Sequence, residues 1–221
     1  MEINYYLEQT NLKPTITAYD IDKLVVEAKE NAFFGICVPP FWVKKAAREI
    51  GGLDIQLVTV VGFPLGYQMT ESKLIEIEKA IEYGANELDV VMNISAFKSG
   101  LSWAKIELAK CAQLIHEAEC VMKVIIETSY LSDKEIVMAA KLCADAGTDF
   151  VKTSTGFSGG GAKTEHVKLM RANLSSNVGI KASGGIKTLA DANALIAAGA
   201  DRLGVSSGVV IMNEYYANQK N

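Results

Sequence analysis

Short apolar runs rich in β-branched residues alternate along this chain with longer amphipathic stretches. The apolar runs predict strands at residues 5–10, 33–38, 55–62, 87–93, 121–128, 150–154, 179–183 and 202–206. The stretches between them have helical periodicity, which is clearest over residues 70–85, 131–147 and 187–200. Eight strands that alternate with helices predict parallel βαβ units and therefore an α/β fold.

Three of the expected helices carry start and stop signals. A hydroxyl residue followed closely by an acid is typical of a helix start, and the pairs here are Thr70 with Glu71, Ser132 with Asp133, and Thr188 with Asp191. A glycine just beyond the last helical turn is typical of a helix end, and the candidates are Gly84, Gly147 and Gly199. These signals support the helix assignments without reference to the apolar pattern.

An internal repeat favours a closed barrel over an open doubly wound sheet. An open sheet usually has a glycine-rich turn after its first strand, whereas this chain reads LEQTNLKPT there. The segments GANELD, GTDFVK and GADRLG share a spacing and end on Asp89, Lys152 and Gly204, in the fourth, sixth and eighth expected strands. Alternate strands of a (β/α)8 barrel contribute to one interior layer. The sequence therefore predicts a (β/α)8 TIM barrel, a single domain over residues 1–221, with these three positions in one layer.

Composition and charge narrow the classes of partner. The chain has 49% hydrophobic and 22% charged residues, enough apolar material for a large core. A net charge of −4 disfavours nucleic acid and anionic membranes as partners, because both need a basic surface. The N-terminal segment has an early acid and no apolar stretch, so no signal peptide is expected and the protein is expected to be cytoplasmic.

Metal and histidine chemistry are also disfavoured. The four cysteines contain no C-x-x-C pair and are expected to be reduced thiols, mostly buried. The two histidines, His116 and His166, lie 50 residues apart, and no local ligand spacing typical of zinc is present. The sequence therefore predicts no metal site.

The interior lysines point to amine chemistry. Lys152 lies in an otherwise apolar strand, and Lys181 occupies the next strand along the chain. Desolvation and a neighbouring like charge both lower a lysine pKa, which is the condition for a nucleophilic amine that forms a Schiff base. The alternative is a buried structural ion-pair network with Asp89. Two lysines and one acid leave an excess cation, which favours a functional site over that alternative. Lys123 and Glu127 are expected to form a supporting pair on the fifth strand.

Glycine and serine residues after the last two strands indicate a phosphate. SGGIKT contains Gly184 and Gly185, and VSSGVVI contains Ser206 and Ser207. Barrels commonly hold phosphate on the backbone N–H groups of these two loops. The alternative is that both segments are only tight turns, but a third glycine-rich loop, TGFSGGGA, favours a bound phosphate.

At these residues the sequence resembles the deoxyribose-phosphate aldolase family. The shared motifs are ELDVVMNI, KVIIET, VKTSTGF, IKASGGI and the final SSG, and they extend from about Asn11 to Ile211. The resemblance implies a (β/α)8 class I aldolase that reversibly cleaves 2-deoxy-D-ribose 5-phosphate to glyceraldehyde 3-phosphate and acetaldehyde, without cofactor or metal. It assigns the Schiff base to Lys152, proton transfer to Lys181 and Asp89, phosphate contacts to Gly184, Gly185, Ser206 and Ser207, and a substrate-facing loop to Thr155 and Gly156. Gly204 is expected from the repeat, not from the resemblance, to leave interior space for the substrate.

Some positions depart from the family pattern. Family members typically carry I-D-H-T where this chain has LEQT, so Glu8 and Gln9 are not assigned a substrate contact. Phe157 stands where some members have lysine. Neither Tyr215 nor Tyr216 is assigned a role in proton transfer, and Cys37 is expected to be a buried bystander.

Two other functions stay open beside the family function. One is a Schiff-base barrel aldolase or transaldolase that acts on another phosphorylated sugar, and the other is a phosphosugar-binding barrel without catalysis. The expected partner in every case is a small phosphosugar, and a homodimer is one assembly open to the chain.

Overall fold

The computed structural model describes residues 2–219 and contains one closed parallel barrel. Its strands pair in chain order and the eighth closes on the first. The strands are β1 Leu7–Thr10, β2 Gly35–Val38, β3 Gln56–Val61, β4 Glu87–Val91, β5 Val121–Ile125, β6 Phe150–Lys152, β7 Gly179–Ser183 and β8 Arg202–Val205. The prediction of a (β/α)8 barrel is confirmed.

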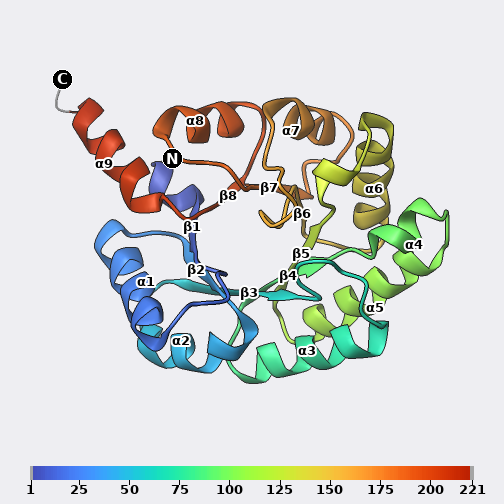
Figure 1. Cartoon of the computed structure of the whole chain (residues 1–221), viewed down its shortest axis with the longest axis horizontal. Helices are drawn as coiled ribbons and strands as arrows, with labels where there is room; N and C mark the ends of the chain where they lie inside the picture. Colours follow the sequence, from blue (N-terminus) through green and yellow to red (C-terminus); the bar gives the residue numbers. More distant parts are fainter. Residues whose placement is uncertain (1, 220–221) are drawn as a thin grey trace.

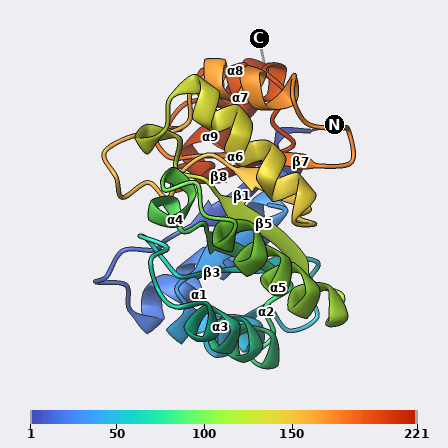
Figure 2. The ribbon, with the colours of Figure 1, turned by 90° about the vertical axis from the view of Figure 1, so that its right-hand side faces the viewer.

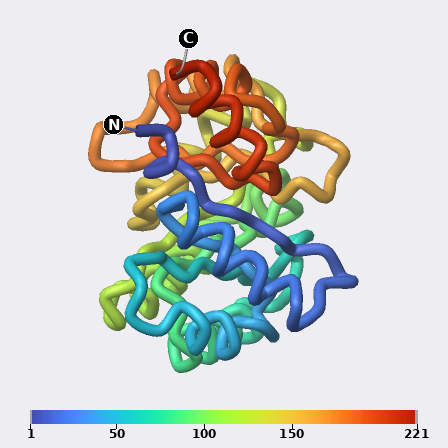
Figure 3. Tube along the Cα trace, turned by 90° about the vertical axis from the view of Figure 1, so that its left-hand side faces the viewer, coloured from blue at the N-terminus to red at the C-terminus, as the bar shows by residue number. Residues whose placement is uncertain are grey.

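Helices surround the strands in chain order (Figure 1). They are α1 Ala18–Asn31, α2 Val43–Ile50, α3 Thr70–Glu82, α4 Ile94–Lys98, α5 Trp103–Glu117, α6 Asp133–Asp145, α7 Thr164–Arg171, α8 Leu189–Ala197 and α9 Gly208–Gln219, with short 3-10 helices η1 Ile3–Tyr6, η2 Pro40–Trp42 and η3 Thr128–Tyr130. Neighbours such as α3 with α5 and α6 with α7 pack side by side around the barrel (Figure 2). At the other side, η1 and α9, the first and last described elements, lie against each other (Figure 3).

The predicted helix signals agree with the structure in all but one case. Ser132 and Thr188 are N-caps with reciprocal capping boxes, and the three glycines follow their helices in the left-handed region. Thr70 is different, because Met69 occupies the N-cap position and Thr70 is the first helical residue. The Thr70 hydroxyl instead donates to Glu107 Oε2 at 3.0 Å, so a tertiary contact takes the group that the sequence suggested as a cap.

The strand β7 has the predicted bounds, and the other seven strands are shorter than predicted, the first and the sixth among them. The first begins at Leu7 because Ile3–Tyr6 forms η1. The sixth ends at Lys152, before Thr153 and Ser154. Beyond that point a backbone bond to β7 remains, from Thr153 N to the Lys181 carbonyl at 3.0 Å. Side chains add further bonds, since the Thr153 hydroxyl accepts from Ser183 N at 3.1 Å and Ser183 Oγ donates to the Ser154 carbonyl at 2.6 Å.

The barrel has two apolar regions that differ in position. The larger core lies between the strands and the helices and contains outward side chains such as Leu57 and Val90. A small cluster of Cys37, Val58 and Val60 is separate from that core and belongs to the other face of its strands. The barrel interior is therefore apolar beside β2 and β3, and the charged side chains come from the other strands. No helix within residues 2–219 is both long and apolar enough to cross a membrane.

Candidate active site

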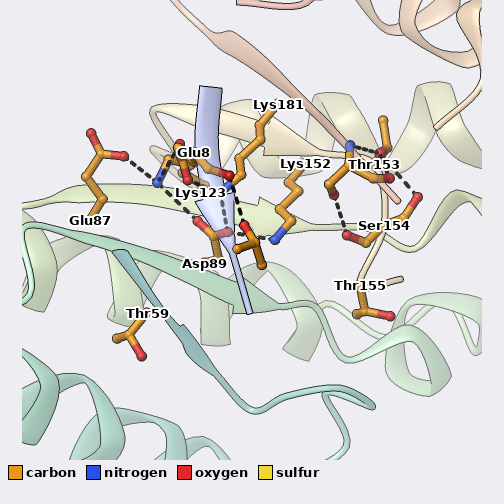
Figure 4. Close-up of polar contacts among 12 residues, drawn as sticks. Glu8, Thr59, Glu87, Asp89, Lys123, Lys152, Thr153, Ser154, Thr155 and Lys181 are labelled. Carbon is orange, nitrogen blue, oxygen red and sulfur yellow. Dashed lines mark hydrogen bonds and ion pairs between the residues drawn. The ribbon is translucent and has the colours of Figure 1, made fainter. Parts of the chain in front are cut away.

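Asp89 lies at the centre of the charged interior. Lys152 Nζ and Lys181 Nζ each donate to Asp89 Oδ2 at 2.7 Å. The strand register brings them together, since Lys152 pairs with Lys181 across β6 and β7. All three side chains point toward one another from β4, β6 and β7 (Figure 4). The structure therefore places the predicted nucleophile and both predicted proton-transfer groups in direct contact.

Further charges from β1, β4 and β5 complete the cluster. Lys123 Nζ lies 3.1 Å from Asp89 Oδ1 and 2.5 Å from Glu87 Oε2. Glu8 pairs with Lys181, and its other oxygen is 3.7 Å from Lys123 Nζ. Three lysines thus face three carboxylates. The prediction of an excess cation is wrong, because it omitted Lys123, Glu8 and Glu87 from the count.

Burial and ion pairing shift the pKa values of these groups in opposite directions. Burial raises the pKa of Asp89, but the three lysines outweigh burial and hold that pKa well below its usual range. Burial also raises the pKa of Glu8, and attraction to Lys123 and Lys181 lowers it further than burial raises it. For Lys181 burial lowers the pKa, and Asp89 and Glu8 together hold it above the ordinary lysine value. Lys181 is therefore a permanent cation at neutral pH, and Asp89 and Glu8 are carboxylates.

Lys152 differs from Lys181 in its access to the cavity. A cavity of about 520 Å³ opens at the carboxyl end of the barrel, and Lys152 lines it. Lys181 has a fully buried side chain and lies behind this surface. Lys152 also has only Asp89 as a charged partner among the described residues, whereas Lys181 has two carboxylates. An aldehyde or ketone in the cavity therefore meets Lys152.

Gly204 faces the same interior, and its missing side chain makes room for a neighbour. A Cβ at Gly204 would lie 3.1 Å from both Lys181 Cε and Ser183 Cβ. Gly204 pairs with Glu8 on one side and Ser183 on the other, and it also lines the cavity. The space predicted for substrate at this position is thus partly occupied by Lys181.

The predicted phosphate loops meet at the rim of the cavity. Gly184 and Gly185 line it with φ of +87° and +78°, a region that favours glycine. The loop after β6 approaches them so closely that a Cβ at Gly161 would lie 2.4 Å from the Gly184 carbonyl oxygen. Ser206 lines the cavity as well, whereas Ser207 does not. Four of the predicted loop residues, Thr155, Gly156, Gly184 and Gly185, therefore border one space with Ser206.

The predicted pair of Lys123 and Glu127 does not exist. The Lys123 ammonium faces Asp89, Glu87 and Glu8 inside the barrel. Glu127 lies just after β5 with φ of +48°, so the strand alternation that suggested the pair no longer applies at this residue. Its carboxylate instead accepts hydrogen bonds from Thr155.

Four residues to which the sequence assigned no catalytic role lie outside the lysine cluster: Gln9, Cys37, Tyr215 and Tyr216. Gln9 lines the cavity, donates to Glu27 at 2.7 Å and accepts from Gly208 N at 3.0 Å, so it connects β1 to α1 and α9. Burial raises the pKa of Cys37 to about 11, which keeps the thiol protonated beside the lysines. Tyr215 and Tyr216 lie on α9 outside the cavity lining.

Sequence reasoning missed Glu8, Glu87 and the central position of Lys123. One signal was available, because Glu87 shares the strand parity of Asp89 and Lys123 is charged within an apolar strand. Glu8 gave no comparable signal, since its partners are more than 100 residues away. Within residues 2–219 no group of three or more His, Cys, Asp or Glu side chains is arranged to hold a metal ion.

The fold and the site define a barrel enzyme with a lysine amine in its cavity. This amine contacts one carboxylate, that of Asp89, and the rim of the cavity is rich in glycine, so the arrangement suits imine chemistry on a small anionic carbonyl compound. The family profile described as DeoC/LacD family aldolase matches residues 5–214. The chain belongs to this family.

Relatives support the same assignment. The chain is 48% identical over 213 residues to a deoxyribose-phosphate aldolase of Brevibacillus brevis, with 96% of each protein covered. It is 49% identical over 215 residues to one of Streptococcus gordonii, again with 96% of each covered. The solved structure of the tetrameric deoxyribose phosphate aldolase of Aeropyrum pernix superposes with a TM-score of 0.91 at 32% identity, covering 98% of this chain and 92% of that one.

Proposed function

We propose that this protein is a deoxyribose-phosphate aldolase that forms a Schiff base on Lys152. The observation that carries the proposal is the position of Lys152, which lines the cavity and bonds to Asp89 at 2.7 Å. The relatives named above share this activity over nearly the full chain. The substrate is 2-deoxy-D-ribose 5-phosphate, and the products are glyceraldehyde 3-phosphate and acetaldehyde.

The chemistry starts with an addition at the substrate aldehyde. The neutral Lys152 amine attacks C1, and loss of the carbonyl oxygen as water gives an iminium. Removal of the C3 hydroxyl proton then breaks the C2–C3 bond and releases glyceraldehyde 3-phosphate. The bonding electrons move into the iminium to give an enamine. Protonation at C2 and hydrolysis release acetaldehyde and restore Lys152.

Asp89 and Lys181 serve the proton transfers in this scheme, through a water between them and the substrate. Burial lowers the pKa of Lys181, but Asp89 and Glu8 raise it further, so Lys181 rests as a cation that can give a proton to the substrate through the water and then take one back. Asp89 contacts both lysine side chains, and its negative charge stabilises Lys181 as a cation. We therefore assign Asp89 and Lys181 a shared role, with Glu8 as the second counterion of Lys181.

The phosphate binds on the loops after β7 and β8. Gly184 and Gly185 border the cavity without side chains, so an anion can approach their backbone. Ser206 lines the same space, and Ser207 directly precedes α9, where its carbonyl accepts from Ile211 N. Gly156 and Gly204 complete the surface between this subsite and Lys152.

The cellular setting and the assembly follow as proposals from the same function. We propose that residues 1–221 act as one catalytic domain in the cytoplasm on a small phosphosugar. A homodimer is the assembly proposed for this chain, and its mass in solution by light scattering tests that assignment.

Borohydride trapping tests the proposed nucleophile. Incubation with acetaldehyde and borohydride should add one ethyl group, which peptide mapping should place on Lys152. The Lys152→Arg variant should neither form the adduct nor cleave deoxyribose 5-phosphate, because a guanidinium stays protonated and cannot form the imine. An ethyl group on Lys181, or cleavage by Lys152→Arg at close to the parent rate, would show that the assignment is wrong.

A further inference from the structure

Glu127 is a buried carboxylate outside the lysine cluster. Its residue is 1% exposed, and no lysine, arginine or histidine of the described chain lies within ion-pair distance of it. Neutral donors satisfy the carboxylate instead. Oε2 accepts from Thr155 N at 2.9 Å and from Thr155 Oγ1 at 2.5 Å, and Oε1 accepts from Ser129 Oγ at 3.2 Å.

These bonds hold the loop that follows the nucleophile. Thr155 lies three residues beyond Lys152 and lines the same cavity (Figure 4). Ser129 also bonds to Ser158 Oγ at 2.8 Å, so Glu127 secures the loop at two points. The loop lies directly on η3 there, since a Cβ at Gly160 would be 2.6 Å from Ser129 Cβ.

The backbone of Glu127 adopts a costly conformation to reach this position. Its φ of +48° and ψ of +74° are in the left-handed region, which residues other than glycine seldom adopt. A glycine would take this conformation more easily. The presence of glutamate there indicates that the carboxylate itself is needed.

The carboxylate also determines which way the Thr155 hydroxyl points. A threonine hydroxyl has one proton, and Thr155 donates it to Glu127 Oε2. The hydroxyl oxygen accepts from Phe157 N at 3.1 Å, and it has no proton left for a ligand. Toward the cavity Thr155 Oγ1 can therefore only accept a hydrogen bond, and a phosphate dianion has no proton to donate.

We infer that Glu127 is a positioning residue that presents Thr155 as a hydrogen-bond acceptor for a sugar hydroxyl, and not for the phosphate. The inference rests on the proposed aldol cleavage and makes it more specific. A sugar hydroxyl is present in deoxyribose 5-phosphate and in unphosphorylated deoxyribose, but not in acetaldehyde. The three compounds therefore separate this role from phosphate binding and from imine formation.

The experiment compares Glu127→Gly with Glu127→Gln. Glycine fits the left-handed backbone but removes the anchor, so kcat/KM should fall about tenfold or more on both sugars, the scale of a misplaced hydrogen bond. Formation of the acetaldehyde adduct on Lys152 should stay within about twofold of the parent. Glutamine keeps one oxygen for both Thr155 groups and an amide for Ser129, so it should retain activity within about threefold.

Threonine variants test the same role with a smaller change. Thr155→Val should show the same loss on both sugars and the same intact adduct formation as Glu127→Gly. The matched control is Thr70→Val, which removes a hydroxyl that also donates to a buried glutamate but lies between α3 and α5, and its kinetics should equal the parent's. This control shows the effect of breaking a threonine–glutamate bond away from the cavity.

Several results would overturn the inference. A loss confined to the phosphorylated sugar in Glu127→Gly or Thr155→Val would make Thr155 a phosphate contact. Parent activity in both variants, or loss of adduct formation in both, would also contradict it. Failure of the proposed function looks different, because the parent protein itself would then neither form the adduct nor cleave deoxyribose 5-phosphate.

Discussion

Adding one methyl group at Gly204 tests how closely the charged cluster is packed. The new Cβ of Gly204→Ala would lie 3.1 Å from Lys181 Cε and from Ser183 Cβ, whereas carbon atoms in ordinary contact are about 3.5–4.0 Å apart. One of the neighbours must therefore move by a few tenths of an ångström. Both neighbours lie on β7, but the backbone fixes Ser183 Cβ, whereas Lys181 Cε is near the end of a long side chain, so Lys181 is the group that moves.

The displacement affects both stability and turnover. Overpacking of this kind costs about 1–3 kcal/mol. For a chain of this size each kcal/mol lowers Tm by roughly 2–4 °C. Lys181 donates to Asp89 Oδ2 at 2.7 Å, so the same movement lengthens a charge-assisted hydrogen bond at the site of proton transfer. Turnover should therefore fall more than about tenfold, and Gly204→Val should have a larger effect.

The assay couples release of glyceraldehyde 3-phosphate to a dehydrogenase and is paired with thermal unfolding. Gly52→Ala is the matched control, because a Cβ there meets nothing within 4 Å and the position is exposed. The control should keep both kcat and Tm. If Gly204→Ala also kept both values, the side chain at position 204 would not face Lys181, and the interior register described above would be refuted.

Three further predictions concern the phosphate, the proton and the charge cluster. The double variant Ser206→Ala/Ser207→Ala should raise KM for deoxyribose 5-phosphate by a factor that corresponds to about 1–3 kcal/mol, the scale of hydrogen bonds to a charged group, and leave KM for unphosphorylated deoxyribose unchanged. Equal losses in steady-state assays of both sugars would contradict this. In Lys181→Leu, mass spectrometry should still detect the acetaldehyde adduct on Lys152, while the rate of cleavage should fall about 10²–10⁴-fold, the range for general acid–base catalysis. Cleavage near the parent rate would show that Lys181 has no part in proton transfer. The pKa of Asp89 in the folded protein lies well below its value in the unfolded chain. The ionised Asp89 carboxylate therefore stabilises the folded state above about pH 4, and this contribution is lost as pH falls further. Urea unfolding at pH 7, 5 and 3 should show the drop only below pH 5, and equal stability at pH 3 and 7 would contradict the ion-pair assignment.

The barrel could be predicted from local patterns because each βαβ unit carries its own signal. Apolar runs identified the strands, capping residues such as Ser132 and Thr188 identified helix starts, and the absence of a glycine-rich first turn favoured closure. Failures occurred where a tertiary contact competed with a local preference. Thr70 binds Glu107 in place of capping its helix, and the segment before Leu7 forms a 3-10 helix in place of strand.

The sequence by itself determined the barrel, the family and three residues of the cluster, Asp89, Lys152 and Lys181, because strand parity and motif spacing are local properties of the chain. Only the tertiary structure decided how their charges are balanced. Glu8 and Lys181 are separated by 173 residues, and closure of β1 on β8 brings them into contact. The link from Glu127 to Thr155 likewise depends on a backbone turn that breaks strand alternation after β5. Charge balance and loop anchoring are properties of the closed barrel, since they arise from groups that meet only after distant strands have been brought into register.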